Sequence, residues 1–397
     1  MFDSISAILF WVALFIVFYA YLGYGILLFF LIQIKRLFRG KPKPPTPRTL
    51  PEVTLLIAAY NEARWIEDKI KNCLQFNYPK EKLHLFFVTD GSDDETPDLI
   101  KNYPVPEGTR LRLFHSPERK GKIAAVERVM PEVKTPIVIY SDANTDVNPD
   151  AIYNIVRHYE DPKTGGVAGE KRIAQKTTAD ATGAGEGIYW KYESLLKKWD
   201  SELYSVVGAA GELFSIRTPL FEHVPPDTII EDFVMTLRIA QKGYRIIYEP
   251  DAYASETQSA SIAEEMKRKI RIAAGGFQAM VRLRSLLNIF KYGILSFQYI
   301  SHRVLRWTLA PAALPVLFIT NLVLALKGNP VFQILLAGQL AFYAFALLGY
   351  LLEKRQMKIR AFFIPYYFCV MNYSVYLGFW RFVKGSQSAV WERAKRA

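Results

Sequence analysis

The feature that most constrains this chain is an apolar run near its start that contains no charged residue. The run lies between Asp3 and Lys35 and reads SISAILFWVALFIVFYAYLGYGILLFFLIQI. A helix that crosses a bilayer needs roughly 20 apolar residues, so this run predicts a membrane anchor with length to spare. A cleavable signal peptide is a weaker interpretation, because the apolar core of such a peptide has roughly 7–15 residues and follows a positively charged segment.

Three further charge-free runs lie near the other end of the chain, at residues 307–326, 328–352 and 361–380. They also predict membrane helices. The last run contains Pro365 and Asn372, so it is either a crossing or a re-entrant or interfacial segment. The sequence therefore predicts either three or four crossings.

These runs divide the chain into six regions. The polar middle has the length of one soluble domain, and the basic, Pro-rich stretch before it should lie in the cytoplasm by the positive-inside tendency. Four crossings would place the basic tail on the opposite side, which conflicts with its charge. We expect a transmembrane anchor at 1–36, a basic Pro-rich linker at 37–52, a cytoplasmic domain at 53–284, an interfacial amphipathic segment at 285–305, a membrane region with two or three transmembrane helices at 306–383, and a basic tail at 384–397.

The chain carries 50 Lys and Arg against 38 Asp and Glu, a net charge of +12. The basic clusters flank the membrane segments, which favours anionic membrane lipids and an anionic substrate as partners. No nucleic-acid-binding module is found, so nucleic acid is not an expected partner. The two cysteines, Cys73 and Cys369, and the five scattered histidines indicate neither a disulfide framework nor a histidine-based metal site.

Short β-rich runs alternate with helical stretches in the polar domain. The runs VTLLIAA, LHLFFVTD, LRLFHS and PIVIYSD predict strands, with helices around 62–74, near Thr96 and from Lys122. This order predicts an α/β fold with a mostly parallel sheet and helices on its faces. Ligands of such sheets bind beyond the carboxyl ends of the strands.

Polar turns follow three of these strands. The turns read Ala-Tyr-Asn-Glu at 59–62, Asp-Gly-Ser-Asp-Asp at 90–94 and Asp-Ala-Asn-Thr-Asp at 142–146. Any one of them is as well explained by turn formation and helix capping. Together they place carboxylates at one edge of the sheet, where a cation would relieve their repulsion, and their hard oxygen atoms suit Mg²⁺ or Mn²⁺ bridging to a diphosphate.

Two other segments carry charge at predicted helix starts. RKGK at 119–122 could present backbone N–H groups and ammonium charge to a phosphate, although surface lysines are usually only solvated. No P-loop and no GxGxxG after a strand is present. Glu231 and Asp232 open another helix, where they either cap it or supply a general base for an acceptor hydroxyl. We expect an acid at a helix start to stay ionised at neutral pH.

At this point the sequence resembles a known family. AAYNE, DGSDD, RKGK, SDANTD, GELFSIR, IEDF and GYRIIYEP follow one another in the order found in glycosyltransferase family 2, which includes cellulose, chitin and hyaluronan synthases and bacterial polysaccharide glycosyltransferases. The resemblance covers about residues 53–278. It implies a nucleotide-sugar-binding sheet of the GT-A type with flanking transmembrane helices.

The resemblance also implies roles for individual residues. It implies that Asp232, with Glu231 beside it, is the catalytic base of a single inverting displacement, in which an acceptor hydroxyl attacks the anomeric carbon. A divalent metal, Mg²⁺ or Mn²⁺, would stabilise the departing diphosphate. The residues implied in binding the nucleotide-sugar are Ala59, Tyr60, Glu62, Asp90, Lys120, Lys122, Asp142 and Arg271, and those implied at the metal are Asp142, Asn144 and Asp146.

The sequence departs from the family at two places. The family's Asp-x-Asp reads here as Asp142-Ala143-Asn144, which replaces one carboxylate by a weaker amide ligand. The Gln-x-x-Arg-Trp motif of processive members is replaced by residues 268–272, RKIRI, which removes an aromatic platform for the acceptor sugar. Weaker hypotheses place Glu212 and Arg268 near the acceptor and give Trp391 a gating role; each is also explained by a structural or anchoring role.

The leading hypothesis is a multi-pass glycosyltransferase of the bacterial inner (plasma) membrane with a cytoplasmic catalytic domain. It would transfer a sugar from a UDP-linked nucleotide-sugar to a hydroxyl of a lipid-linked or glycan acceptor, in polysaccharide or glycolipid synthesis with export proteins as candidate partners. The alternative is a catalytically weak scaffold or binding subunit of a polysaccharide synthesis and export complex. A channel or transporter is disfavoured, because the predicted membrane segments contain no charged residues.

Overall fold

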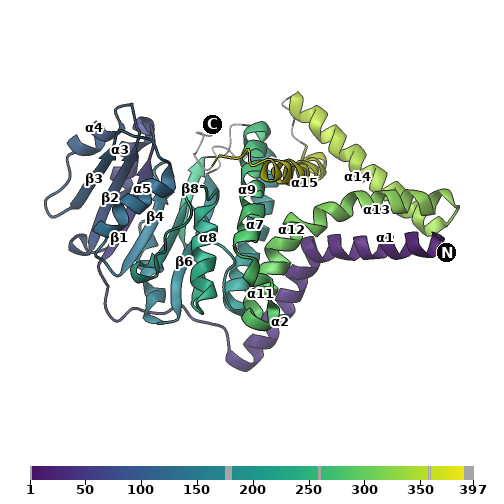
Figure 1. The fold of residues 1–397 in the computed structure, drawn as a ribbon, viewed down its shortest axis with the longest axis horizontal. Helices are drawn as coiled ribbons and strands as arrows, with labels where there is room; N and C mark the ends of the chain where they lie inside the picture. The colour runs from purple at the N-terminus through teal and green to yellow at the C-terminus, as the bar shows by residue number, and fades with distance from the viewer. Residues whose placement is uncertain (1, 175–180, 258–260, 356, 358, 389–397) are drawn as a thin grey trace.

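The computed structural model describes residues 2–174, 181–257, 261–355, 357 and 359–388. Figure 1 shows the sheet at one end of the molecule, long apolar helices at the other, and helices α7 and α9 between them. The strands are β1 Val53–Ala59, β2 Leu83–Asp90, β3 Arg110–Ser116, β4 Ile137–Asp142, β5 Asp146–Val147, β6 Thr164–Ala174, β7 Leu213–Arg217 and β8 Arg245–Thr257. The main helices are α1 Phe2–Phe18, α2 Tyr24–Arg39, α3 Ala63–Leu74, α4 Thr96–Asn102, α5 Lys122–Val129, α6 Ala151–Val156, α7 Ala181–Leu203, α8 Glu231–Gln241, α9 Ile262–Arg282, α11 Ile294–Tyr299, α12 Leu305–Trp307, α13 Leu309–Leu326, α14 Pro330–Lys354 and α15 Arg360–Val383.

The eight strands form one mixed sheet in the order β3-β2-β1-β4-β7-β6-β8-β5. β3, β2, β1 and β4 are parallel, β7 is antiparallel to β4 and β6, and β6 pairs in parallel with β8. The α/β fold with a mostly parallel sheet is therefore confirmed. The four predicted strands of the first half end where the structure ends them, because each is an uninterrupted β-rich run followed by a polar turn.

The sheet has a hydrophobic core on each face. Successive side chains of a strand point to opposite faces, so Leu56 of β1 belongs to one core while Leu55 and Ile57 belong to the other. Helices α3 and α6 contribute to the core of Leu55 and Ile57, and helices α5 and α8 contribute to the core of Leu56. Both cores hold the strand ends in fixed positions.

The first apolar run is one helical segment with a change of direction. A π-helical turn at Tyr19–Gly23 separates α1 from α2, and Figure 1 shows the chain bending between them. Helix α1 packs on α13, whereas Tyr24 and Leu28 of α2 are buried against Leu196 of α7. The N-terminal helix therefore connects the apolar helices to the sheet domain.

Three helical segments of the described chain are long and apolar enough to cross a membrane: Ser4–Arg39, Leu309–Leu326 and Pro330–Lys354. These three apolar helices indicate that the protein associates with a membrane.

The fourth charge-free run forms α15, which packs on α9 so closely that a Cβ on Gly378 would come within 2.5 Å of the Cβ of Ala273. The side chains of Tyr299 and His302, in the segment expected at the membrane interface, are fully buried; the position of that segment relative to a membrane stays a prediction.

Candidate active site

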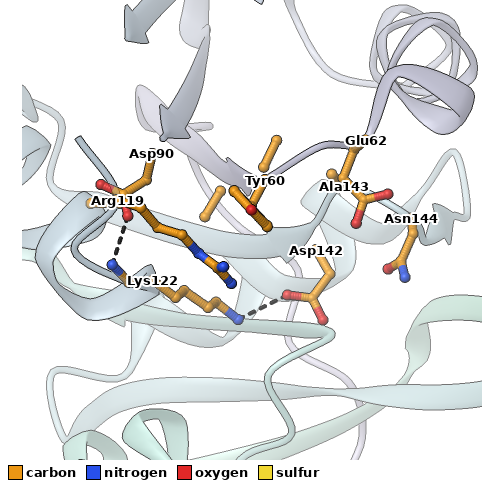
Figure 2. A pocket seen from close by; sticks show the side chains of 12 residues that line it. Tyr60, Glu62, Asp90, Arg119, Lys122, Asp142, Ala143 and Asn144 are labelled. Atoms are coloured by element: carbon orange, nitrogen blue, oxygen red, sulfur yellow. Dashed lines mark hydrogen bonds and ion pairs between the residues drawn. The ribbon is translucent and has the colours of Figure 1, made fainter. Parts of the chain in front are cut away.

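The carboxyl ends of β1, β2 and β4 form a pocket at one edge of the sheet. Parallel pairing sets Ala58 beside Asp142 and Ala59 beside Thr89, so the polar turns that follow these strands meet. We call this the edge pocket. Its lining includes Ala59, Tyr60, Glu62, Asp90, Arg119, Lys122, Asp142 and Asn144 (Figure 2).

Tyr60 and Arg119 form a flat wall of the edge pocket. The guanidinium carbon of Arg119 lies 3.7 Å from the centre of the Tyr60 ring, a distance typical of a cation–π contact. Two planar groups of this kind can bind a planar heterocycle by stacking. The sequence predicted Tyr60 at this place, whereas Arg119 was not among the predicted binding residues.

Asp90 is buried in the wall of the edge pocket, where its carboxylate is hydrogen-bonded to neighbouring residues. Its Oδ2 accepts hydrogen bonds from the backbone N–H groups of Lys120, at 2.8 Å, and Gly121, at 2.6 Å, and its Oδ1 accepts one from Arg128 at 3.3 Å. Gly121 has a φ of 96°, a conformation that glycine adopts without strain. The carboxylate therefore fixes the loop that starts α5.

The four residues of RKGK have different surroundings. The ammonium of Lys120 pairs with Glu118 at 2.9 Å, and the Lys120 side chain is 63% exposed; it lines neither of the two cavities described here. The side chain of Lys122, in contrast, lines both cavities. Its Nζ lies 2.8 Å from Asp142 Oδ1, a contact that Figure 2 shows, and 3.4 Å from Glu231 Oε1. Burial alone would lower the pKa of Lys122, but Asp142 and Glu231 raise it, so the ammonium stays charged.

Lys122 and Asp142 also line a second, larger space. This cavity has a volume of about 740 Å³ and lies among α7, α8, α9 and the segment around α12. We call it the helix-side cavity. Its lining includes Trp190, Glu193, Lys197, Glu212, Asp232, Arg268, Lys269, Arg271, Arg303, Trp307 and Arg381.

Asp232 opens α8 and faces this cavity near Lys122. A Cβ placed on Gly211 would lie 3.3 Å from Asp232 Oδ2 and 3.6 Å from Lys122 Nζ, so the three residues surround one small space. Burial, and then the adjacent Glu231 carboxylate, raise the pKa of Asp232 to about 7, although Lys122 opposes the shift. Burial thus acts against the expectation that an acid at a helix start stays ionised at neutral pH.

The other predicted cavity residues are held by neighbours. Glu212 Oε1 accepts hydrogen bonds from Lys171, at 2.5 Å, and from Arg268, at 3.1 Å. Although burial acts in the opposite direction, these cations lower the pKa of Glu212 below its usual range. Arg271 donates to the carbonyl of Ile229 at 3.1 Å. Trp391 lies outside the described residues.

Two of the three residues predicted to bind the metal ion lie in the same pocket. Asp142 and Asn144 line the edge pocket, whereas Asp146 starts β5, pairs with Ser255 and lines neither cavity. The described residues contain no cluster of three or more His, Cys, Asp or Glu side chains suited to a metal ion. One carboxylate and one amide oxygen still fit Mg²⁺ or Mn²⁺, since such ions take their remaining ligands from substrate phosphates and water.

Sequence reasoning missed Arg119, Trp190, Lys197, Arg303 and Trp307. Trp190 and Lys197 are seven positions apart on α7, so with Glu193 they form one helix face. That spacing is visible in the sequence. Nothing in the sequence shows that this face meets α8 and α9 in one cavity.

Comparisons with known proteins agree with the fold and the motifs. Residues 54–224 match the model of the family described as Glycosyl transferase family 2. A poly-beta-1,6-N-acetyl-D-glucosamine synthase of Staphylococcus aureus is 30% identical over 237 residues, which are 58% of this chain and 56% of that protein. The chain thus spans little more than half the length of these curated relatives. The probable glycosyltransferase YdaM of Bacillus subtilis is 24% identical over 340 residues, 80% of this chain and 79% of that protein.

Among solved structures, a mannosyltransferase from Pyrobaculum calidifontis in complex with GDP-Man and Mn²⁺ has the same fold. The TM-score is 0.70 at 23% identity, with 94% of this chain and 99% of that chain covered. The match extends beyond the sheet domain to most of the helices. The GT-A fold that the motifs implied is confirmed.

Proposed function

We propose that this chain, which carries a glycosyl transferase family 2 domain at residues 54–224, transfers a sugar from a UDP-linked nucleotide-sugar to a hydroxyl group of a membrane-bound acceptor. The observation that carries the proposal is the meeting of two cavities at one ion pair. Lys122 and Asp142 line both the edge pocket and the helix-side cavity. Asp232 lines the helix-side cavity.

In this proposal the edge pocket binds the donor. The stacked Tyr60 and Arg119 hold the base, and the loop fixed by Asp90 closes the pocket beside the start of α5. Asp142 and Asn144 would hold a divalent cation, which would neutralise negative charge on the departing diphosphate. Lys122 adds a positive charge at the junction, where the sugar passes from the donor to the acceptor.

The helix-side cavity binds the acceptor, and Asp232 takes the proton of the attacking hydroxyl. A base works best when its pKa is close to the working pH, and the pKa of Asp232 is about 7. The hydroxyl attacks the anomeric carbon from the side of Asp232 while the diphosphate leaves toward the edge pocket. This single displacement inverts the anomeric centre and needs no covalent intermediate.

We place the protein in a bacterial inner membrane with the sheet domain in the cytoplasm. Three crossings by Ser4–Arg39, Leu309–Leu326 and Pro330–Lys354 return the basic C-terminal tail to the side of the domain, in accord with the positive-inside tendency. The product would belong to a polysaccharide or glycolipid, and proteins of an export complex are candidate partners. A reporter fused after Ala397 that is active only in the periplasm would contradict this topology.

The test is a transfer assay with membranes that contain the full chain. Radiolabelled UDP- and GDP-sugars are supplied with Mn²⁺ or Mg²⁺, and label is counted in lipid and in polymer. We expect one donor to be used and EDTA to abolish its use. If no sugar moves under any condition while the protein is folded, the chain is a scaffold rather than an enzyme and the proposal fails.

A further inference from the structure

One face of α7 faces the helix-side cavity. It consists of Trp190, Glu193 and Lys197, which recur at the three- and four-residue spacing of a helix. Lys197 is 5% exposed and is among the residues that line this cavity. A nearly buried lysine in a ligand cavity needs an explanation.

The ammonium of Lys197 makes no hydrogen bond and no ion pair with any residue that the structure describes. It lies 5.8 Å from the centre of the Trp190 ring and 5.9 Å from that of the Tyr248 ring. Burial, the dominant influence, lowers the pKa of Lys197. The two rings offer weak cation–π contacts, but a buried ammonium that makes no hydrogen bond and no ion pair is unfavourable for the folded state.

Three carboxylates act on Lys197 electrostatically: Glu193 and Glu212 are bound by other side chains, and Glu170 accepts a hydrogen bond from Ser194 at 2.6 Å. Glu193, one helical turn away, accepts from Arg303 at 2.7 Å, from Arg306 at 3.2 Å and from His302 at 3.3 Å. Glu212 is bound by Lys171 and Arg268. Among the described residues, none of these three carboxylates forms an ion pair with Lys197, so they act on its ammonium only at longer range.

Building on the proposed transfer reaction, we infer that Lys197 is the centre of a subsite that binds an oxyanion of the acceptor, a phosphate or a carboxylate. Lys269 and Arg303 line the same cavity and add positive charge. The half-buried Trp190 supplies an apolar surface beside it. The cavity volume of about 740 Å³ is within the usual range for a ligand site.

The position of the cavity favours a phosphate carried by a lipid. Arg303 and Trp307 line the cavity, and α13, which begins at Leu309, is a candidate membrane span. An acceptor phosphate held near Lys197 would therefore lie close to the start of a membrane helix. The acceptor hydroxyl would lie further along the same cavity, toward Asp232.

The experiment uses the full chain in nanodiscs of zwitterionic lipid. Binding is measured for farnesyl phosphate and for trigalacturonic acid, with farnesol and maltotriose as their uncharged counterparts. The wild type should bind at least one oxyanion probe about tenfold more tightly than its counterpart, since a hydrogen bond to a charged group is among the stronger ones. Which of the two probes is preferred identifies the source of the oxyanion.

Two variants of adjacent lysines separate the subsite from general charge effects. Lys197→Met should lose the preference and should melt at a higher temperature than the wild type, because it removes an unpaired buried charge. The exposed Lys198 is the matched control, and Lys198→Met should keep the preference. A merely structural Lys197 would instead leave binding unchanged and lower the melting temperature on replacement.

Each failure has its own signature. If Lys197→Met keeps the preference, or if the wild type prefers neither oxyanion probe, the subsite is wrong. If the wild type transfers no sugar in the transfer assay but Lys197 still confers the preference for an oxyanion probe, the subsite is supported and the proposed function fails.

Discussion

The edge pocket and the helix-side cavity share the Lys122–Asp142 ion pair but are assembled differently. The edge pocket takes its lining from residues 58–144, mostly from turns that follow neighbouring parallel strands. The lining of the helix-side cavity comes from residues 122–388, on elements as distant in sequence as α7 and α15. In the proposed division of labour, the first is a compact donor site and the second is adapted to an acceptor at the membrane.

Replacing a residue of the shared ion pair should impair the edge pocket and the helix-side cavity together, and it should therefore have the largest effect on sugar transfer. Lys122→Met would leave the Asp142 and Glu231 carboxylates without the ammonium that pairs with both. Loss of one group that stabilises transition-state charge typically lowers kcat by a factor of about 100–1,000, and we expect a fall of that size in sugar transfer.

The matched control for this change is Lys120→Met. Lys120 is exposed and pairs with Glu118, and in the structure only its backbone N–H contacts Asp90. Transfer by this variant should stay close to that of the wild type. Equal losses in the two variants would show that general positive charge, rather than the junction, matters.

The pH dependence of kcat should arise from Asp232 in the helix-side cavity and not from the edge pocket. Asp232 must be deprotonated to act as the base, and its pKa is about 7, so kcat should rise about tenfold per pH unit below that value and level off above it. Glu231→Gln removes a neighbouring negative charge that raises the pKa of Asp232, so the break in the profile should move to lower pH. Donor affinity should show no matching break; a break in donor affinity at the same pH would place Asp232 in the donor site.

The smallest effect is expected at Gly211. A Cβ there would approach Asp232 Oδ2 to 3.3 Å, which is tight and would displace the carboxylate slightly. Since small misplacements of a catalytic group reduce its effectiveness, Gly211→Ala should lower kcat by roughly three- to tenfold without changing donor affinity. An unchanged kcat would show that the acceptor hydroxyl does not depend on this placement of Asp232.

The same contrast explains what could be predicted from sequence. Strands, helix starts and the edge pocket were accessible because β-rich runs ending in polar turns fix both the sheet and the side chains at its edge, as for Tyr60 and Asp142. Arg119 was missed because its neighbours in RKGK offered the same charge, and only the fold shows which of them face the pocket.

The helix-side cavity could be predicted only in part. Asp232 stood out by its place in IEDF, but its pKa depends on burial, which the position at a helix start does not show. Lys197 belongs to a helix face that is readable from spacing. Its lack of an ion pair depends on contacts of its neighbours: Arg303, Arg306 and His302 converge on Glu193, and Ser194 donates to Glu170. Contacts between residues this distant in sequence arise only from tertiary packing.

The division of the site into a donor pocket and an acceptor cavity is tested most directly with Asp232→Asn. The measurement pairs calorimetric titration of the purified variant with its preferred nucleotide-sugar and a transfer assay on the same preparation. We expect donor affinity within about threefold of the wild type and a loss of transfer of at least about 100-fold, the scale of a missing general base. Transfer at the wild-type rate, or loss of donor binding together with transfer, would contradict this division of the site.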